Sequence, residues 1–139
     1  MHSPDTRWVQ RFTNFERTFL LLRDALTIDS PSRLERAGII QFFKVGLELA
    51  LKVLRDYQTA ECSTPLLTPK QAIHQGCIKQ LISREADWIN ALQCRRLIAE
   101  SYNENNAIAL EQAIRRRYYG LLQALYQTLK QKTEGGGNS

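Results

Sequence analysis

Arg95 and Tyr102 are the residues whose types and spacing most suggest chemistry. They lie seven positions apart, so on a helix they share one face two turns apart. Trp88 falls on the same face, where we expect burial, and a buried guanidinium needs an anionic partner such as a phosphate or a carboxylate. Spacing alone leaves two interpretations open: a structural arginine paired with an internal carboxylate, or an anion-binding group.

Two further basic features lie near these residues or later in the chain. Arg96 and Glu100 are four apart and can form a surface ion pair, which stabilises a helix by only a few tenths of a kcal/mol. Arg115, Arg116 and Arg117 are consecutive, so they cannot form one helical patch alone. The run is either a solvated basic face or a contact point for RNA phosphates or an acidic partner.

Residues that ligate metals are few. The three cysteines form no C-x-x-C pair, and with only His2 and His74 no zinc set can be assembled. The glycine-rich phosphate loops, the nucleophilic-serine elbow and the H-E-x-x-H motif are missing from the sequence. We therefore expect no metal and no cofactor, reduced thiols, and His74 as a lone surface histidine.

The elements that must position these residues are helices. The chain has 139 residues, with only seven glycines and four prolines, so the regularly spaced turns of a sandwich or barrel are missing. Apolar residues recur at steps of three and four, which predicts amphipathic helices. We expect them over residues 5–27, 31–58, 69–82, 84–102 and 104–130.

Helix start signals support this order. They are Ser30 before Pro31, the capping box of Thr68 with Gln71, Ser83, and Asn103. Gly38 is expected to mark a bend and Gly46 a close approach of a neighbouring helix. The predicted fold is all-α: an antiparallel up-and-down bundle of four main helices and one short helix, in a single domain over residues 1–133, with a disordered tail over residues 134–139.

The charge and hydropathy limit the partners. The net charge is +5 and the pI is about 9.3, which fits contact with phosphates, an acidic protein or a nucleotide. No apolar run approaches the ~20 residues that a bilayer span needs. We expect a cytoplasmic protein without a membrane partner.

Three segments match a known family in order and spacing. Residues 11–16 read RFTNFE, similar to RFxNxE; residues 48–57 read ELALKVLRDY, similar to ELAWKxLKDY; and residues 88–104 resemble WxxMLxxRNxxxHxYNE. The likeness extends over about residues 7–130. The chain resembles the HEPN-fold nucleotidyltransferase substrate-binding proteins, the small helical partners of minimal nucleotidyltransferases.

The resemblance implies an antiparallel helical bundle, usually dimeric, with a minimal nucleotidyltransferase on a separate chain as its partner. In relatives with a full R-x4–6-H motif the protein is a metal-independent ribonuclease, and the pair acts as toxin and antitoxin. There the nucleotidyltransferase silences the toxin by adding AMP to the tyrosine after the histidine. Arg95 matches the family arginine and Tyr102 the AMP acceptor.

Two departures from this motif affect its chemistry. Arg96 stands where the family usually has Asn, and Glu100 stands at the histidine position. Such a ribonuclease needs an imidazole near neutral pH, whereas a glutamate is ionised at pH 7 and repels phosphate. We therefore expect a degenerate motif at Arg95 and Glu100, with weak or no catalysis by the chain itself.

The first functional hypothesis is a non-catalytic subunit that binds substrate and docks the nucleotidyltransferase as a homodimer. Its expected substrate- or partner-binding residues, with nucleotide or RNA as possible ligands, are Arg95, Arg96, Tyr102, Lys52 and Trp88. The second hypothesis is a ribonuclease toxin that uses Glu100 as an unusual base. The third is a scaffolding bundle in which an internal carboxylate neutralises Arg95.

Overall fold

The computed structural model describes residues 4–62, 65–100 and 103–136; the side chains of residues 4–6, 96–100 and 135–136 lie outside that description. Throughout these ranges the regular elements are helices, with no strand. They are α1 (Pro4–Ala25), α2 (Arg33–Glu61), α3 (Pro69–Ile78), α4 (Glu85–Glu100), α5 (Glu104–Ala113), the π-helical turn η1 (Ile114–Tyr118) and α6 (Tyr119–Gly136).

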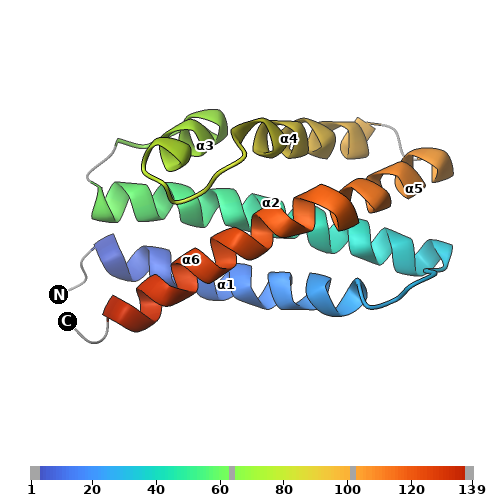
Figure 1. The fold of residues 1–139 in the computed structure, drawn as a ribbon, viewed down its shortest axis with the longest axis horizontal. Helices are drawn as coiled ribbons and strands as arrows, with labels where there is room; N and C mark the ends of the chain where they lie inside the picture. Colours follow the sequence, from blue (N-terminus) through green and yellow to red (C-terminus); the bar gives the residue numbers. More distant parts are fainter. Residues whose placement is uncertain (1–3, 63–64, 101–102, 137–139) are drawn as a thin grey trace.

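The helices form an antiparallel bundle, which confirms the predicted all-α class (Figure 1). α1 and α2 pack as a hairpin, and α3 and α4 follow each other along α2 on the side away from α1. α5, η1 and α6 form one long helix that crosses α1 and α2, and it ends beside the start of α1. None of the described helices is long and apolar enough to cross a membrane.

Aromatic side chains along α1 form one side of the core. The stripe that predicts this helix is buried along its length: Trp8, Phe12, Phe15, Phe19 and Leu22 are each at most 3% exposed. Tyr126 of α6 stacks on this stripe, with ring centroids 5.7 Å from Phe12 and 4.7 Å from Phe19. Burial of this area is the main force that fixes α6 across α1.

The N-terminus of α2 corrects one predicted cap. Ser32, not Ser30, is the N-cap: its hydroxyl accepts from the backbone N–H of Glu35 at 3.1 Å, and the Glu35 carboxylate accepts from the N–H of Ser32 at 2.8 Å. This reciprocal box satisfies two donors that the helix leaves unpaired, so it outweighs the Ser30–Pro31 signal. Pro31 therefore precedes the helix rather than opening it.

The caps of the later helices are partly as predicted. The Thr68 capping box and the Asn103 cap are confirmed. Ser83 does not cap α4, because the helix begins after Arg84, which has a φ of 63° and whose side chain bonds Asp87 at 3.0 Å. α3 ends at Ile78 instead of residue 82, since the chain turns at Gln80, with a φ of 61°.

The last helix differs from the prediction in two ways. A π turn at Ile114–Tyr118 interrupts it, and the N–H of Tyr119 accordingly donates to the carbonyl of Ile114. It then continues to Gly136, beyond the expected end at residue 130. Residues 134–136 of the expected disordered tail are therefore helical, and residues 137–139 lie outside the description.

α2 continues without interruption through Gly38, from Arg33 to Glu61. A Cβ at Gly38 would meet no atom within 4 Å, so Gly38→Ala is expected to raise the free energy of unfolding by about 0.5–1 kcal/mol through its helix propensity. Urea denaturation followed by circular dichroism measures this change in the free energy of unfolding.

Gly76→Ala is the control. A Cβ at Gly76 would lie 3.2 Å from Ile82 Cγ1, so this substitution should raise the free energy of unfolding by less than Gly38→Ala does. A destabilised Gly38→Ala variant would contradict the open space at this position.

Candidate functional site

A groove lies where α2, α3 and α4 meet, and we name it the cationic groove. It encloses about 180 Å³. Its lining residues come from all three helices and from the segment before α3: Glu48, Leu51, Lys52, Arg55, Leu67, Pro69, Ala72 and Arg95. The structure thus brings together two of the residues expected to form the site, Lys52 and Arg95, from helices far apart in sequence.

The spacing along α2 explains the polar wall of the groove. Glu48, Lys52 and Arg55 lie four and three residues apart, so they follow one face of the helix. Leu51, 5% exposed, and Ala72 of α3, fully buried, provide apolar surface beneath them. The packing of α3 against α2 therefore holds the charged side chains at the edge of an apolar floor.

Positive charge is incompletely neutralised in this groove. Arg55 Nε is buried without a hydrogen-bond partner, and its ion pair with Asp56 Oδ1 spans 3.6 Å. Asp56 also contacts Arg11, so one carboxylate serves two guanidinium groups. Among the side chains that the structure describes, no carboxylate forms an ion pair with Arg95. The internal partner that the scaffolding hypothesis needs is thus missing from that part of the chain.

Trp88 lies on the same side of α4 as Arg95 but deeper in the molecule. Its side chain is 1% exposed and belongs to the core, as does Ala91 one turn later. The indole therefore has almost no surface with which to touch a partner directly. Its place in the core assigns Trp88 to holding α4 in the bundle, and Arg95 reaches the groove from the same helix.

The remaining expected site residues lie outside the description. The side chains of Arg96 and Glu100 belong to the undescribed end of α4, and Tyr102 lies in the undescribed segment that follows. The degenerate catalytic motif and the AMP acceptor therefore stay predictions from the sequence.

A second hollow adjoins the cationic groove. It encloses about 360 Å³ and shares Leu67 with the groove; the other lining residues are Lys70, Gln71, His74, Gln75, Glu85 and Ile89. His74 Nδ1 lies 3.2 Å from Glu85 Oε2, which connects α3 to α4. The expectation of a lone surface histidine is wrong in this respect, and no local pattern pairs two residues across the turn between these helices.

A comparison with protein-family models gives a match that includes the groove and the second hollow. A family model described as nucleotidyltransferase substrate binding protein like matches residues 10–131. The chain belongs to this family. The match contains every residue that lines the cationic groove and the second hollow. A search of curated proteins found no match.

In this member of the substrate-binding family, η1 contacts α4 next to Arg95. The Tyr118 hydroxyl lies 3.5 Å from Cys94 Sγ, and the Tyr118 ring stacks on Phe43 of α2, with centroids 5.6 Å apart. Burial, with a smaller contribution from Cys94, raises the pKa of Tyr118 to about 12. The phenol is therefore neutral at physiological pH and serves as a fixed packing contact between η1, α2 and α4.

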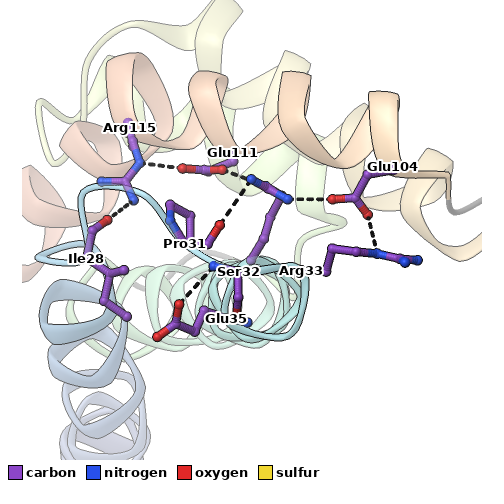
Figure 2. Close-up of polar contacts among 9 residues, drawn as sticks. Ile28, Pro31, Ser32, Arg33, Glu35, Glu104, Glu111 and Arg115 are labelled. Atoms are coloured by element: carbon purple, nitrogen blue, oxygen red, sulfur yellow. Dashed lines mark hydrogen bonds and ion pairs between the residues drawn. The ribbon is translucent and has the colours of Figure 1, made fainter.

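A buried carboxylate ties the family member's last helix to the α1–α2 connection (Figure 2). Glu111, 7% exposed, accepts hydrogen bonds of 2.8 Å from Arg36 Nε and from Arg115 Nε. Burial alone would raise the pKa of Glu111, but the hydrogen bonds from Arg36 and Arg115 hold it below its ordinary value of 4.5. The charge of Glu111 is thus compensated on both sides.

Glu111, Arg36 and Arg115 form what we name the Glu111 cluster, and the two arginines connect it to further partners. Arg115 donates to the carbonyls of Leu26 at 2.9 Å and Ile28 at 2.7 Å, and Arg36 also bonds Glu104. Arg115 is therefore a structural residue. Arg116 and Arg117 remain exposed, so only these two members of the basic run present charge to solvent.

Proposed function

We propose that the chain is the substrate-binding subunit of a two-chain nucleotidyltransferase system, acting as a homodimer that docks a minimal nucleotidyltransferase. The observation that carries this proposal is the family match over residues 10–131, which includes a groove with incompletely neutralised cations. The partner chain supplies the transfer chemistry, and this chain supplies a surface that holds the molecule to be modified.

The proposal gives the chain no catalysis of its own. We base this on Glu100, which takes the place of the histidine in the R-x4–6-H motif of the HEPN proteins that the sequence resembles. A glutamate carboxylate at that position repels a scissile phosphate and is a poor general acid at neutral pH. Arg95 is then free to bind an anion in place of assisting cleavage.

Co-expression with a minimal nucleotidyltransferase encoded beside this chain tests the docking. We expect the two chains to copurify through a tag on either one and to migrate together in size exclusion at micromolar concentrations. Light scattering should assign two copies of this chain to the complex. Two folded proteins that elute separately would contradict the proposal.

An RNA cleavage assay tests the ribonuclease alternative. The purified chain is expected to leave RNA intact, because it lacks the histidine. Cleavage that disappears in Arg95→Ala would support the toxin hypothesis in its place. Intact mass after co-expression shows whether Tyr102 gains AMP.

A further inference from the structure

The cationic groove has the charge pattern of an anion site. Lys52, Arg55 and Arg95 line it, against the single carboxylate of Glu48. Elsewhere Arg36 forms ion pairs with both Glu104 and Glu111. In the groove, Arg55 shares Asp56 with Arg11, and Arg95 forms no ion pair with any side chain that the structure describes. The groove is thus a place where cations from two different helices gather with too few carboxylates to neutralise them.

We propose that this groove binds a small phosphate monoester with a hydroxylated carbon skeleton, its phosphate held by Lys52, Arg55 and Arg95. Guanidinium groups match phosphate oxygens with paired N–H donors, and the lysine adds a compact charge. Arg55 Nε is buried and lies 3.6 Å from Asp56 Oδ1, so Arg55 contributes the charge of its guanidinium group to this site and not this particular N–H.

Glu48 defines the rest of the ligand. An ionised carboxylate only accepts hydrogen bonds, so it suits a ligand hydroxyl beside the phosphate. It also repels a second phosphate, which disfavours an extended polyanion such as an RNA strand. Leu51, Leu67 and Ala72, which also line the groove, provide apolar contact for the carbon skeleton.

The size of the two hollows places the ligand. The groove of about 180 Å³ is smaller than the ~300–1,000 Å³ of most ligand sites, so alone it holds no ligand larger than a sugar phosphate. The second hollow, about 360 Å³, continues from it at Leu67 and carries the amides of Gln71 and Gln75. A sugar phosphate fills the first hollow, and a nucleoside monophosphate extends into the second.

This inference rests on the proposed function only in naming the ligand as the substrate presented to the nucleotidyltransferase; the binding belongs to this chain alone. It is therefore tested on the isolated full-length chain by isothermal titration calorimetry with four probes: inorganic phosphate, ribose 5-phosphate, AMP and adenosine. We expect ribose 5-phosphate and AMP to bind more tightly than adenosine. If AMP binds more tightly than ribose 5-phosphate, the ligand is a nucleoside monophosphate. If the two bind equally, the ligand is a sugar phosphate.

Variants locate the phosphate. Arg95→Ala and Lys52→Ala are each expected to weaken ribose 5-phosphate binding by about 10–100-fold, the loss of one charged hydrogen bond. Arg116→Ala removes the same charge from an exposed position on η1, and it should change binding less than about twofold. Unfolding curves confirm that all three variants fold.

Several outcomes would overturn the inference. These are equal binding of adenosine and AMP, unchanged binding in both groove variants, or no heat with any probe at millimolar concentration. An RNA oligonucleotide that binds more tightly than ribose 5-phosphate through the same residues would assign the groove to RNA. A nucleotidyltransferase complex that forms without phosphate binding removes this inference alone, whereas phosphate binding without a complex removes the proposed function.

Discussion

Replacing Trp88 with alanine is expected to lower the free energy of unfolding by about 3–5 kcal/mol, the usual cost of removing a large aromatic side chain from a packed core. The indole is 1% exposed, and it belongs to the cluster that contains the inner faces of α1, α2 and α6. The cavity cannot collapse easily, because rigid helices surround it. Loss of this side chain should also loosen α4 and so disturb the position of Arg95.

Urea denaturation followed by circular dichroism measures the effect. Leu34→Ala is the control, since that leucine is 83% exposed, and it should change stability by less than about 0.5 kcal/mol. A Trp88→Ala variant that keeps its stability but no longer binds the nucleotidyltransferase would instead support the direct partner contact predicted for Trp88 from the family resemblance.

Replacing Glu111 with alanine is expected to lower the free energy of unfolding by about 3 kcal/mol, because two guanidinium groups lose the carboxylate between them. Arg115 keeps its backbone acceptors at Leu26 and Ile28, so the loss falls mainly on the attachment of α2 to α5. Glu61→Ala, at an exposed position near the end of α2, is the control and should lie within about 0.5 kcal/mol of the wild type. Equal stability of the two variants would contradict a structural role for Glu111.

The same carboxylate predicts a pH dependence. The pKa of Glu111 is lower in the folded chain than its ordinary 4.5. At pH values between the folded pKa and 4.5, the unfolded state therefore binds more protons than the folded state. The stabilisation is present above pH 4.5 and is lost as the pH falls through the folded pKa. The stability gap between the wild type and Glu111→Gln should therefore narrow as the pH drops below about 4.5. A gap that widens on acidification would refute the depressed pKa.

The helices were predictable because their signals are local. The aromatic stripe of α1 repeats at helical spacing, and the Thr68 and Asn103 caps act within three residues of themselves. The same logic favours Ser32, since Glu35 follows it by three, and the Ser30–Pro31 pair obscured this signal. The π turn was not predictable, because a tertiary contact with the α1–α2 connection fixes Arg115 within it.

The site was predictable in part. Lys52 and Arg95 follow from the matched family segments, and both line the groove. Glu48 and Arg55 lie on the same helical face as Lys52, and their spacing of four and three residues would have predicted them as neighbours of Lys52 in the site. The contribution of α3, and the pairing of His74 with Glu85, depend on how two helices meet across a turn, which no spacing within one helix encodes.

The π turn also governs how the chain can change in length. A π turn holds one residue more than an α turn, so deleting one residue within Ile114–Tyr118 restores α geometry and leaves the helices on either side in register. A deletion within α5 or α6 would instead rotate every later side chain by about 100°. Relatives one residue shorter in this helix can therefore keep both the Glu111 cluster and the α1 contacts of α6 if the gap falls at η1.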